Sequence, residues 1–227
     1  MTIHVINPNS SDAVTEAIDR AIDPMRAHAP VAIRCHTLAE GPPGIETQAH
    51  VDLVVPPLMA FARTLRGDAS AFVVACFSDP GLFALREAHD LPVLGIAESA
   101  MLHAATLGQR LGILSIRRAS VARHFRYAGA MGLAGRLAGD RAIDLGVAEL
   151  GDEARTLSRL ESVGRILRDE DGADVLITGC AGMARYRGAL EARLDMPVVD
   201  PCQAATALAI GRVALAACER PERRTSA

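Results

Sequence analysis

The apolar residues of the chain fall into short runs rich in β-branched side chains, separated by longer segments rich in Ala, Arg and Leu. Most of the short runs are continuously apolar, which is typical of parallel strands buried on both faces. The longer segments have the length and spacing of helices. The pattern predicts strands over 2–6, 31–36, 71–75, 93–96, 110–114, 142–147, 175–178 and 197–199, and helices over 11–28, 48–66, 80–89, 98–107, 118–131, 152–169, 184–193 and 202–218.

Strands that alternate with helices predict an α/β fold, and eight such units also permit an eightfold barrel. An internal repeat favours a different architecture. The segment AFVVACFSDPGLFALREAHDLPVLGI and the later segment DVLITGCAGMARYRGALEARLDMPVVD each contain an apolar strand, a cysteine, a glycine-containing turn, a helix and a proline that opens the next strand. Pro92 follows Cys76 by 16 residues, and Pro197 follows Cys180 by 17. The repeat predicts two similar parallel-sheet domains.

A weaker match pairs VINPNSS in the first half with GILSIRRAS in the second. We therefore expect a first domain of residues 1–97 plus 202–227 and a second of residues 98–201, related by a pseudo-twofold axis. The last helix is expected to return and pack on the first domain. Residues 219–227 are charged and contain proline, and we expect them to fray.

The composition excludes several classes of protein. All 24 basic residues are Arg. Without lysine there is no pyridoxal Schiff base and no standard phosphate-loop lysine. The net charge of −3 gives no reason to expect nucleic acid or a membrane as partner. The histidines lack metal-binding spacing and no GxGxxG motif occurs, so neither a metal nor a dinucleotide is expected.

The five cysteines are scattered and odd in number, which argues against a disulfide framework and for a reducing cytoplasm. The N-terminus lacks the features of a secretory signal, and no uninterrupted apolar run reaches the length of a membrane span. We therefore expect a soluble cytoplasmic protein that acts on a small molecule.

Cys76 and Cys180 occupy matched positions in the repeat, each after a strand and before a helix. Ligands of parallel sheets lie beyond the carboxyl ends of the strands, and a helix N-terminus favours a thiolate. A pseudo-twofold axis would place one thiol on each face of a prochiral carbon, as a two-base racemase requires. Backbone amides after each cysteine are expected to stabilise the developing enolate; they belong to Phe77, Ser78, Ala181 and Gly182.

The chain resembles the aspartate/glutamate racemase superfamily, and within it the hydantoin racemases, which include allantoin racemases. The resemblance rests on VINPNSS, GPPGIE, ACFSDPGL, VLGIAESA, TGCAGM and MPVVD. It implies a site between two domains, no cofactor, Cys76 and Cys180 as proton-transfer groups, and assembly into homo-oligomers. The small residues Ala181 and Gly182 after Cys180 resemble the hydantoin group, whose substrate is a neutral five-membered ring. Ile116 departs from that group's tandem hydroxyl residues.

Other residues are candidates for substrate binding. Asn7 ends the first strand, where its amide can bind the ring or serve the turn. Ile45 is expected to form an apolar wall, and Ser115 to keep one hydroxyl in the pocket. Asp79 precedes Pro80, a pattern that predicts the N-cap of the helix starting there.

Two classes of function remain open from the residues. The first is a cofactor-independent racemase of 5-substituted hydantoins, with allantoin and amino-acid racemases as alternatives within the superfamily. The second is a small-molecule binding protein without turnover. A binding protein has no need of a thiol on each face of its ligand, which favours the enzyme. A decarboxylase of the superfamily is expected to keep only one cysteine.

Overall fold

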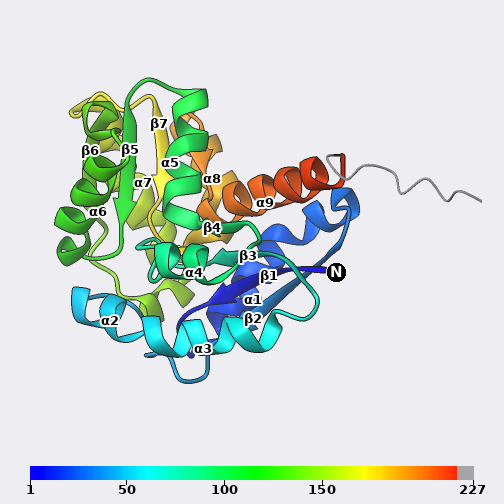
Figure 1. Ribbon diagram of the computed structural model, residues 1–227. Helices are drawn as coiled ribbons and strands as arrows, with labels where there is room; N and C mark the ends of the chain where they lie inside the picture. The colour runs from blue at the N-terminus through cyan, green and yellow to red at the C-terminus, as the bar shows by residue number, and fades with distance from the viewer. Residues whose placement is uncertain (219–227) are drawn as a thin grey trace, which may run out of the picture.

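The computed structural model describes residues 1–218, so the fraying expected for 219–227 lies outside the described residues. Figure 1 shows two parallel sheets flanked by helices. The first sheet has the order β2-β1-β3-β4 and the second the order β6-β5-β7-β8. This confirms the predicted α/β fold with two similar sheets. The strands are β1 (Thr2–Asn7), β2 (Ala32–Thr37), β3 (Ala69–Val74), β4 (Val93–Gly95), β5 (Leu111–Ser115), β6 (Leu137–Ala142), β7 (Val175–Thr178) and β8 (Val198–Val199).

The helices follow the predicted segments, with three of them divided. The segment 184–193 spans the end of a 3-10 helix (Ala181–Tyr186) and most of an α-helix (Arg187–Leu194). Residues 11–28 form α1 and then a 3-10 helix, and Val54 separates α2 from α3. Pro56 has no N–H and cannot continue the hydrogen bonding of the preceding helix. The α-helices are α1 (Asp12–Ile22), α2 (Gln48–Leu53), α3 (Val55–Leu65), α4 (Leu82–Ala88), α5 (Ile96–Leu107), α6 (Arg118–Ala130), α7 (Glu153–Asp169), α8 (Arg187–Leu194) and α9 (Pro201–Cys218). The 3-10 helices are η1 (Asp23–His28), η2 (Ala134–Arg136), η3 (Val147–Gly151) and η4 (Ala181–Tyr186).

The predicted strand over 142–147 is wrong. Strand β6 covers Leu137–Ala142 instead and pairs only with β5. As an edge strand it carries the polar residues Asp140 and Arg141, so it lacks the apolar run of a central strand. The apolar residues that suggested a strand, among them Ile143 and Leu145, are buried in the connection that follows.

One apolar core runs through both sheets. Its buried residues include Ile3 and Val73 from the first sheet and Ile113 and Ile177 from the second. Cys202 at the start of α9 belongs to the same core. Since the two sheets share this core, the halves of the molecule are packed directly on each other.

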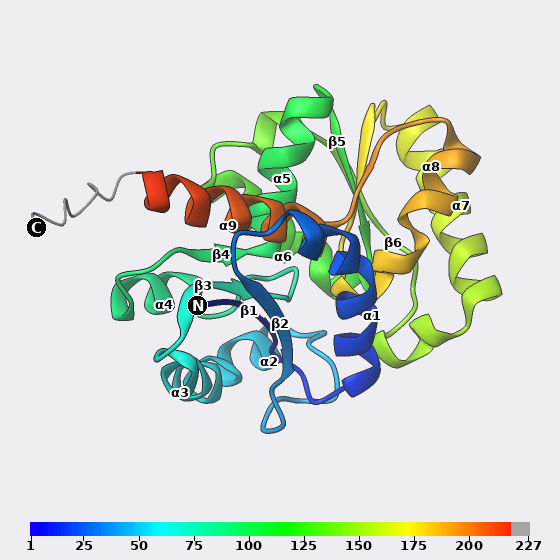
Figure 2. The same ribbon diagram turned by 90° about the vertical axis from the view of Figure 1, so that its right-hand side faces the viewer.

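Helix α9 connects the two halves. It contacts α5, β3, α1 and β4, and Figure 2 shows it beside α5 at the junction of the sheets. By length and composition alone, α9 is apolar enough to cross a membrane. Its first half is buried in the protein core, with Cys202, Ala205 and Ala209 inaccessible to solvent. The apolar composition of this half is therefore accounted for by packing.

Asp79 caps a different helix from the one predicted. Helix α4 begins at Leu82 with Gly81 as its N-cap, so Asp79 is not its capping residue. The Asp79 carboxylate instead accepts hydrogen bonds from the N–H groups of Ala97 and Glu98, both at 2.9 Å, in the first turn of α5. The hydroxyl of Tyr127 on α6 donates a third bond at 2.8 Å. Asp79 therefore ties the turn after β3 to α5 and α6.

Two backbone features make this contact possible. Asp79 adopts a left-handed conformation with φ of 43°, which Asp tolerates better than most residues. Gly95 lies directly against the carboxylate, because a Cβ there would come within 2.2 Å of Asp79. A side chain at position 95 is therefore incompatible with the cap.

We expect Asp79→Ala to lower the free energy of unfolding by about 2–4 kcal/mol, because the cap of α5 is lost and the half-buried hydroxyl of Tyr127 loses its acceptor. Asp144→Ala is the matched control, since Asp144 is exposed and also has a positive φ, of 57°. Urea unfolding of both variants measures the difference. Equal losses would attribute the effect to the backbone conformation instead of the cap.

Candidate active site

An equivalent backbone hydrogen bond precedes each of the two motif cysteines, Cys76 and Cys180. Before Cys76, the N–H of Ala75 donates to Ile6 O at 2.8 Å. Before Cys180, the N–H of Gly179 donates to Leu114 O at 2.9 Å. Each bond extends the strand pairing by one residue beyond the end of a central strand, β3 or β7. Both cysteines therefore lie at the carboxyl ends of the sheets. At Gly179 a Cβ would lie 2.7 Å from Leu114 O, which explains the glycine.

The turns after the cysteines also correspond. The carbonyl of Cys76 accepts a hydrogen bond from the N–H of Asp79 at 2.9 Å. The carbonyl of Cys180 accepts one from the N–H of Met183 at 3.1 Å. The matched positions inferred from the repeat are therefore matched in three dimensions.

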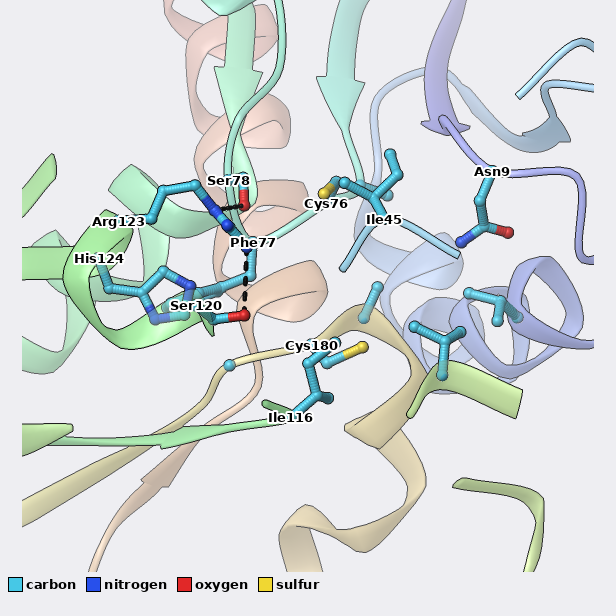
Figure 3. A pocket seen from close by; sticks show the side chains of 15 residues that line it. Asn9, Ile45, Cys76, Phe77, Ser78, Ile116, Ser120, Arg123, His124 and Cys180 are labelled. Atoms are coloured by element: carbon cyan, nitrogen blue, oxygen red, sulfur yellow. Dashed lines mark hydrogen bonds between the residues drawn. The ribbon is translucent and has the colours of Figure 1, made fainter. Parts of the chain in front are cut away.

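Both thiols line one pocket, and Figure 3 shows Cys76 and Cys180 on different sides of it. Among the described residues, no Asp or Glu lines this pocket, and most of the lining is apolar or uncharged. The lining residues are Asn9, Val14, Ile45, Ala75, Cys76, Phe77, Ser78, Ile116, Ser120, Arg123, His124, Val147, Gly179, Cys180 and Ala181.

The structure brings most of the predicted site residues together. Ile45, Phe77, Ser78 and Ala181 line the pocket beside the two cysteines. Gly182 is not among the residues that line the pocket; its backbone N–H lowers the pKa of Cys180, as the N–H of Ser78 does for Cys76. These two amides therefore favour the ionised form of the sulfur atoms, and the role toward a substrate oxygen that the sequence suggests stays a prediction.

Asn7 is not among the residues that line the pocket. It is buried, and its amide nitrogen donates to Asn9 Oδ1 at 3.0 Å, to Ser11 O at 3.2 Å and to Thr15 Oγ1 at 3.0 Å. These bonds hold the loop that presents Asn9 to the pocket. The sequence contains both amides, and only the conformation of this loop decides which of them faces the cysteines.

Ser115 is also absent from the pocket lining. It is fully buried, and its hydroxyl donates to the carboxylate of Asp140. His124 Nδ1 lies 2.8 Å from Asp140 Oδ2 and 3.0 Å from Ser115 Oγ. The ring of His124 packs edge-on to Phe77, with centroids 5.0 Å apart. Ser115 therefore helps to orient His124, which lines the pocket together with Ile116.

Sequence reasoning missed Arg123 and His124, which the structure places in the pocket. Arg123 Nε donates to Ser78 Oγ at 3.0 Å, and Nη2 donates to Ser120 Oγ at 3.1 Å. A signal was present in the sequence, because the buried face of α6 carries polar residues where apolar ones are usual. Ser120, Arg123 and His124 repeat at the spacing of that face.

Burial dominates the electrostatics of the two thiols. It raises the pKa of Cys76 to about 12 and that of Cys180 to about 11. The N–H of Ser78 and the charge of Arg123 act in the opposite direction on the pKa of Cys76, and the N–H of Gly182 does so for Cys180. At neutral pH both sulfurs of the free protein therefore carry protons.

Among residues 1–218, no cluster of three or more His, Cys, Asp or Glu side chains is arranged to hold a metal ion. Cys35, Cys76, Cys180, Cys202 and Cys218 are all free thiols. The pocket therefore offers thiols, an imidazole, a guanidinium, two serine hydroxyls, the amide of Asn9 and backbone amides.

Comparison with solved structures identifies the class of protein. An allantoin racemase from Klebsiella pneumoniae is 33% identical, with a TM-score of 0.86 over 95% of this chain and 89% of that one. The allantoin racemase AllR from Pseudomonas fluorescens is 27% identical, with a TM-score of 0.88 over 95% of this chain and 92% of that one. The fold is that of a two-domain α/β isomerase of the racemase type.

The family follows from the sequence comparisons. The model of the Asp/Glu/Hydantoin racemase family matches residues 3–209. A hydantoin racemase from Paenarthrobacter aurescens is 36% identical over 222 residues, which cover 95% of this chain and 92% of the relative. The chain belongs to the Asp/Glu/Hydantoin racemase family, and the resemblance inferred from its motifs is confirmed.

We expect alkylation of Cys76 and Cys180 by iodoacetamide to accelerate about tenfold for each pH unit between 7 and 10, since the thiolate is the reacting form and the pKa of each thiol is raised. Peptide mapping by mass spectrometry measures each rate, with the exposed Cys218 as an internal reference for the reagent. A plateau near pH 7 at either motif cysteine would contradict the effect of burial.

Proposed function

We propose that the protein is a cofactor-independent racemase of 5-substituted hydantoins, with Cys76 and Cys180 as its two proton-transfer groups. The observation that carries the proposal is the pair of thiols at matched positions on different sides of one pocket. The similarity to hydantoin racemases supports the choice of substrate class.

The reaction exchanges one proton on each face of the ring carbon C5. One cysteine first loses its proton to solvent. The thiolate so formed takes the C5 proton and becomes a thiol, and the electron pair left on C5 delocalises onto the adjacent carbonyl as an enolate. The other thiol donates its proton to the opposite face and becomes the thiolate. The total charge of the site is unchanged, and the protonation states of the two sulfurs are exchanged.

The properties of the pocket suit this exchange. The mechanism needs one thiolate and one thiol, and burial opposes the state in which both sulfurs are charged. The C5 proton of a hydantoin is more acidic than that of an amino-acid carboxylate, because no carboxylate charge opposes its loss. The N–H groups of Ser78 and Gly182 stabilise whichever sulfur is ionised.

The lining of the pocket favours a small, neutral ring. Ile45, Ile116 and Val147 form apolar walls, and Ala181 leaves space next to Cys180. Asn9 offers an amide nitrogen that can donate to a ring carbonyl, while its amide oxygen already accepts from Asn7 Nδ2 and from the N–H of Ser11.

The runner-up functions are racemisation of allantoin and of acidic amino acids. Allantoin is itself a 5-substituted hydantoin, and the two similar solved structures are described as allantoin racemases. A binding protein without turnover is disfavoured by the second thiol. A panel of hydantoins, allantoin and free amino acids separates these possibilities.

We also propose that the enzyme acts in the cytoplasm as a homo-oligomer, without nucleic acid or a membrane as partner. The five free thiols support a reducing compartment. As domain boundaries we propose 1–97 plus 202–227 for the first domain and 98–201 for the second, which assigns β1–β4 to one and β5–β8 to the other.

In D2O, we expect the wild-type protein to racemise an enantiopure 5-substituted hydantoin and to incorporate deuterium at C5. Cys76→Ser and Cys180→Ser should each lower the racemisation rate at least about 1000-fold, because a serine hydroxyl is a much weaker acid than a thiol. Polarimetry and mass spectrometry measure the two effects after subtraction of the spontaneous rate.

Cys218→Ser is the matched control, since this exposed thiol at the end of α9 lies outside the pocket. It should keep wild-type activity. A cysteine variant that still exchanges deuterium from one enantiomer alone assigns the remaining thiol to one face of the ring. Full activity in both pocket variants would overturn the two-base mechanism.

A further inference from the structure

Arg123 is a buried cation without a carboxylate partner. Its exposed fraction is 8%, and among the described residues no carboxylate oxygen lies within 4.0 Å of its guanidinium. Arginines this deeply buried are usually paired with an acidic group, since an unpaired charge is costly to desolvate. The guanidinium therefore lacks the counter-ion that its position calls for.

The hydrogen bonds of Arg123 are all to neutral acceptors. Nε donates to Ser78 Oγ at 3.0 Å, Nη2 donates to Ser120 Oγ at 3.1 Å, and Nη1 donates to Ala119 O at 3.5 Å. One N–H of each terminal nitrogen has no partner among the described residues. Figure 3 shows the guanidinium held next to Ser78 on the side of the pocket formed by α6.

The ionisable groups nearby do not neutralise this charge. The Asp140 carboxylate is occupied by Ser115 and His124. Cys76 is a thiol at neutral pH, because burial raises its pKa to about 12. Asp52 and Arg126 also face Arg123, at longer range and with opposite charges. The counter-ion is therefore expected to come from a ligand.

The space beside Arg123 continues away from the cysteines. A second hollow adjoins the pocket and shares Phe77, Ser78, Arg123 and His124 with it. Like the pocket, this hollow has no Asp or Glu in its described lining, and Gln48 and Arg126 lie at its outer side. A substituent that leaves the ring toward α6 would meet the free N–H groups of Arg123.

We propose that Arg123, held by Ser78 and Ser120, forms an anion subsite that selects hydantoins whose C5 substituent ends in a carboxylate. This inference rests on the proposed racemase function and names its substrate class. A guanidinium with free N–H groups on both terminal nitrogens matches the two oxygens of a carboxylate, and such charge-assisted pairs are stronger than neutral hydrogen bonds. Arg123 is thereby a specificity-determining residue, distinct from the two proton-transfer groups.

The test compares two substrates of nearly equal shape, 5-(2-carboxyethyl)hydantoin and 5-(2-carbamoylethyl)hydantoin. We expect wild-type kcat/KM to favour the carboxylate at least about tenfold, because only the carboxylate forms a charge-assisted pair. Arg123→Gln should lower this selectivity at least about tenfold, mainly through a higher KM for the carboxylate substrate. Arg118→Gln removes the same charge from an exposed position of the same helix and should retain the wild-type selectivity.

The outcomes separate this inference from the function on which it rests. Equal losses of kcat/KM for both substrates in Arg123→Gln would show that Arg123 acts through Cys76, and would overturn the subsite. A wild-type protein that racemises 5-methylhydantoin but does not prefer the carboxylate would also overturn the subsite, while the racemase function stands. This wild-type comparison decides even when Arg123→Gln does not fold. Absence of racemisation with every hydantoin would reject both proposals.

Discussion

The site depends on one repeated constraint, the backbone hydrogen bond that carries each central strand past its last paired residue. Ala75 is bound to Ile6 in the first sheet, and Gly179 to Leu114 in the second. These bonds fix where the chain turns after each central strand, and therefore the position of each cysteine. Neither sheet holds a complete site, because each contributes one thiol. The core shared by both sheets keeps the two turns facing each other.

The sequence predicted what depends on local pattern and on repetition. The α/β class, most elements and the matched cysteines follow from apolar runs and from the repeated motif. It failed where several local partners were chemically equivalent or where the partner is distant in sequence. Asp79 has the pattern of a local cap, yet it caps a helix that starts 17 residues later. Arg123 reaches Ser78 across 45 residues, and no local pattern indicates such a contact.

Desolvation acts on the pocket in two opposite ways. It keeps both thiols protonated, since a buried sulfur anion is unfavourable, but it cannot neutralise a guanidinium in the same manner. The pocket without a ligand therefore contains the positive charge of Arg123 and no negative side chain among the residues that line it. With the anion subsite proposed for Arg123, an anionic substituent of the substrate supplies the missing negative charge when it binds. Recognition and charge compensation then occur in the same step.

The two sulfurs have matched backbones and different surroundings, since Arg123 and Ser78 lie beside Cys76, whereas Ala181 and Gly182 follow Cys180. For an interconversion of enantiomers, this difference has a thermodynamic limit. Mirror-image molecules have equal free energies in solution, so the equilibrium constant is one and kcat/KM must be the same in both directions. An asymmetric pocket can give one enantiomer a lower KM, but kcat for that enantiomer must then be lower by the same factor. The unequal lining can therefore give the two enantiomers different values of KM and kcat, while the mixture at equilibrium stays racemic.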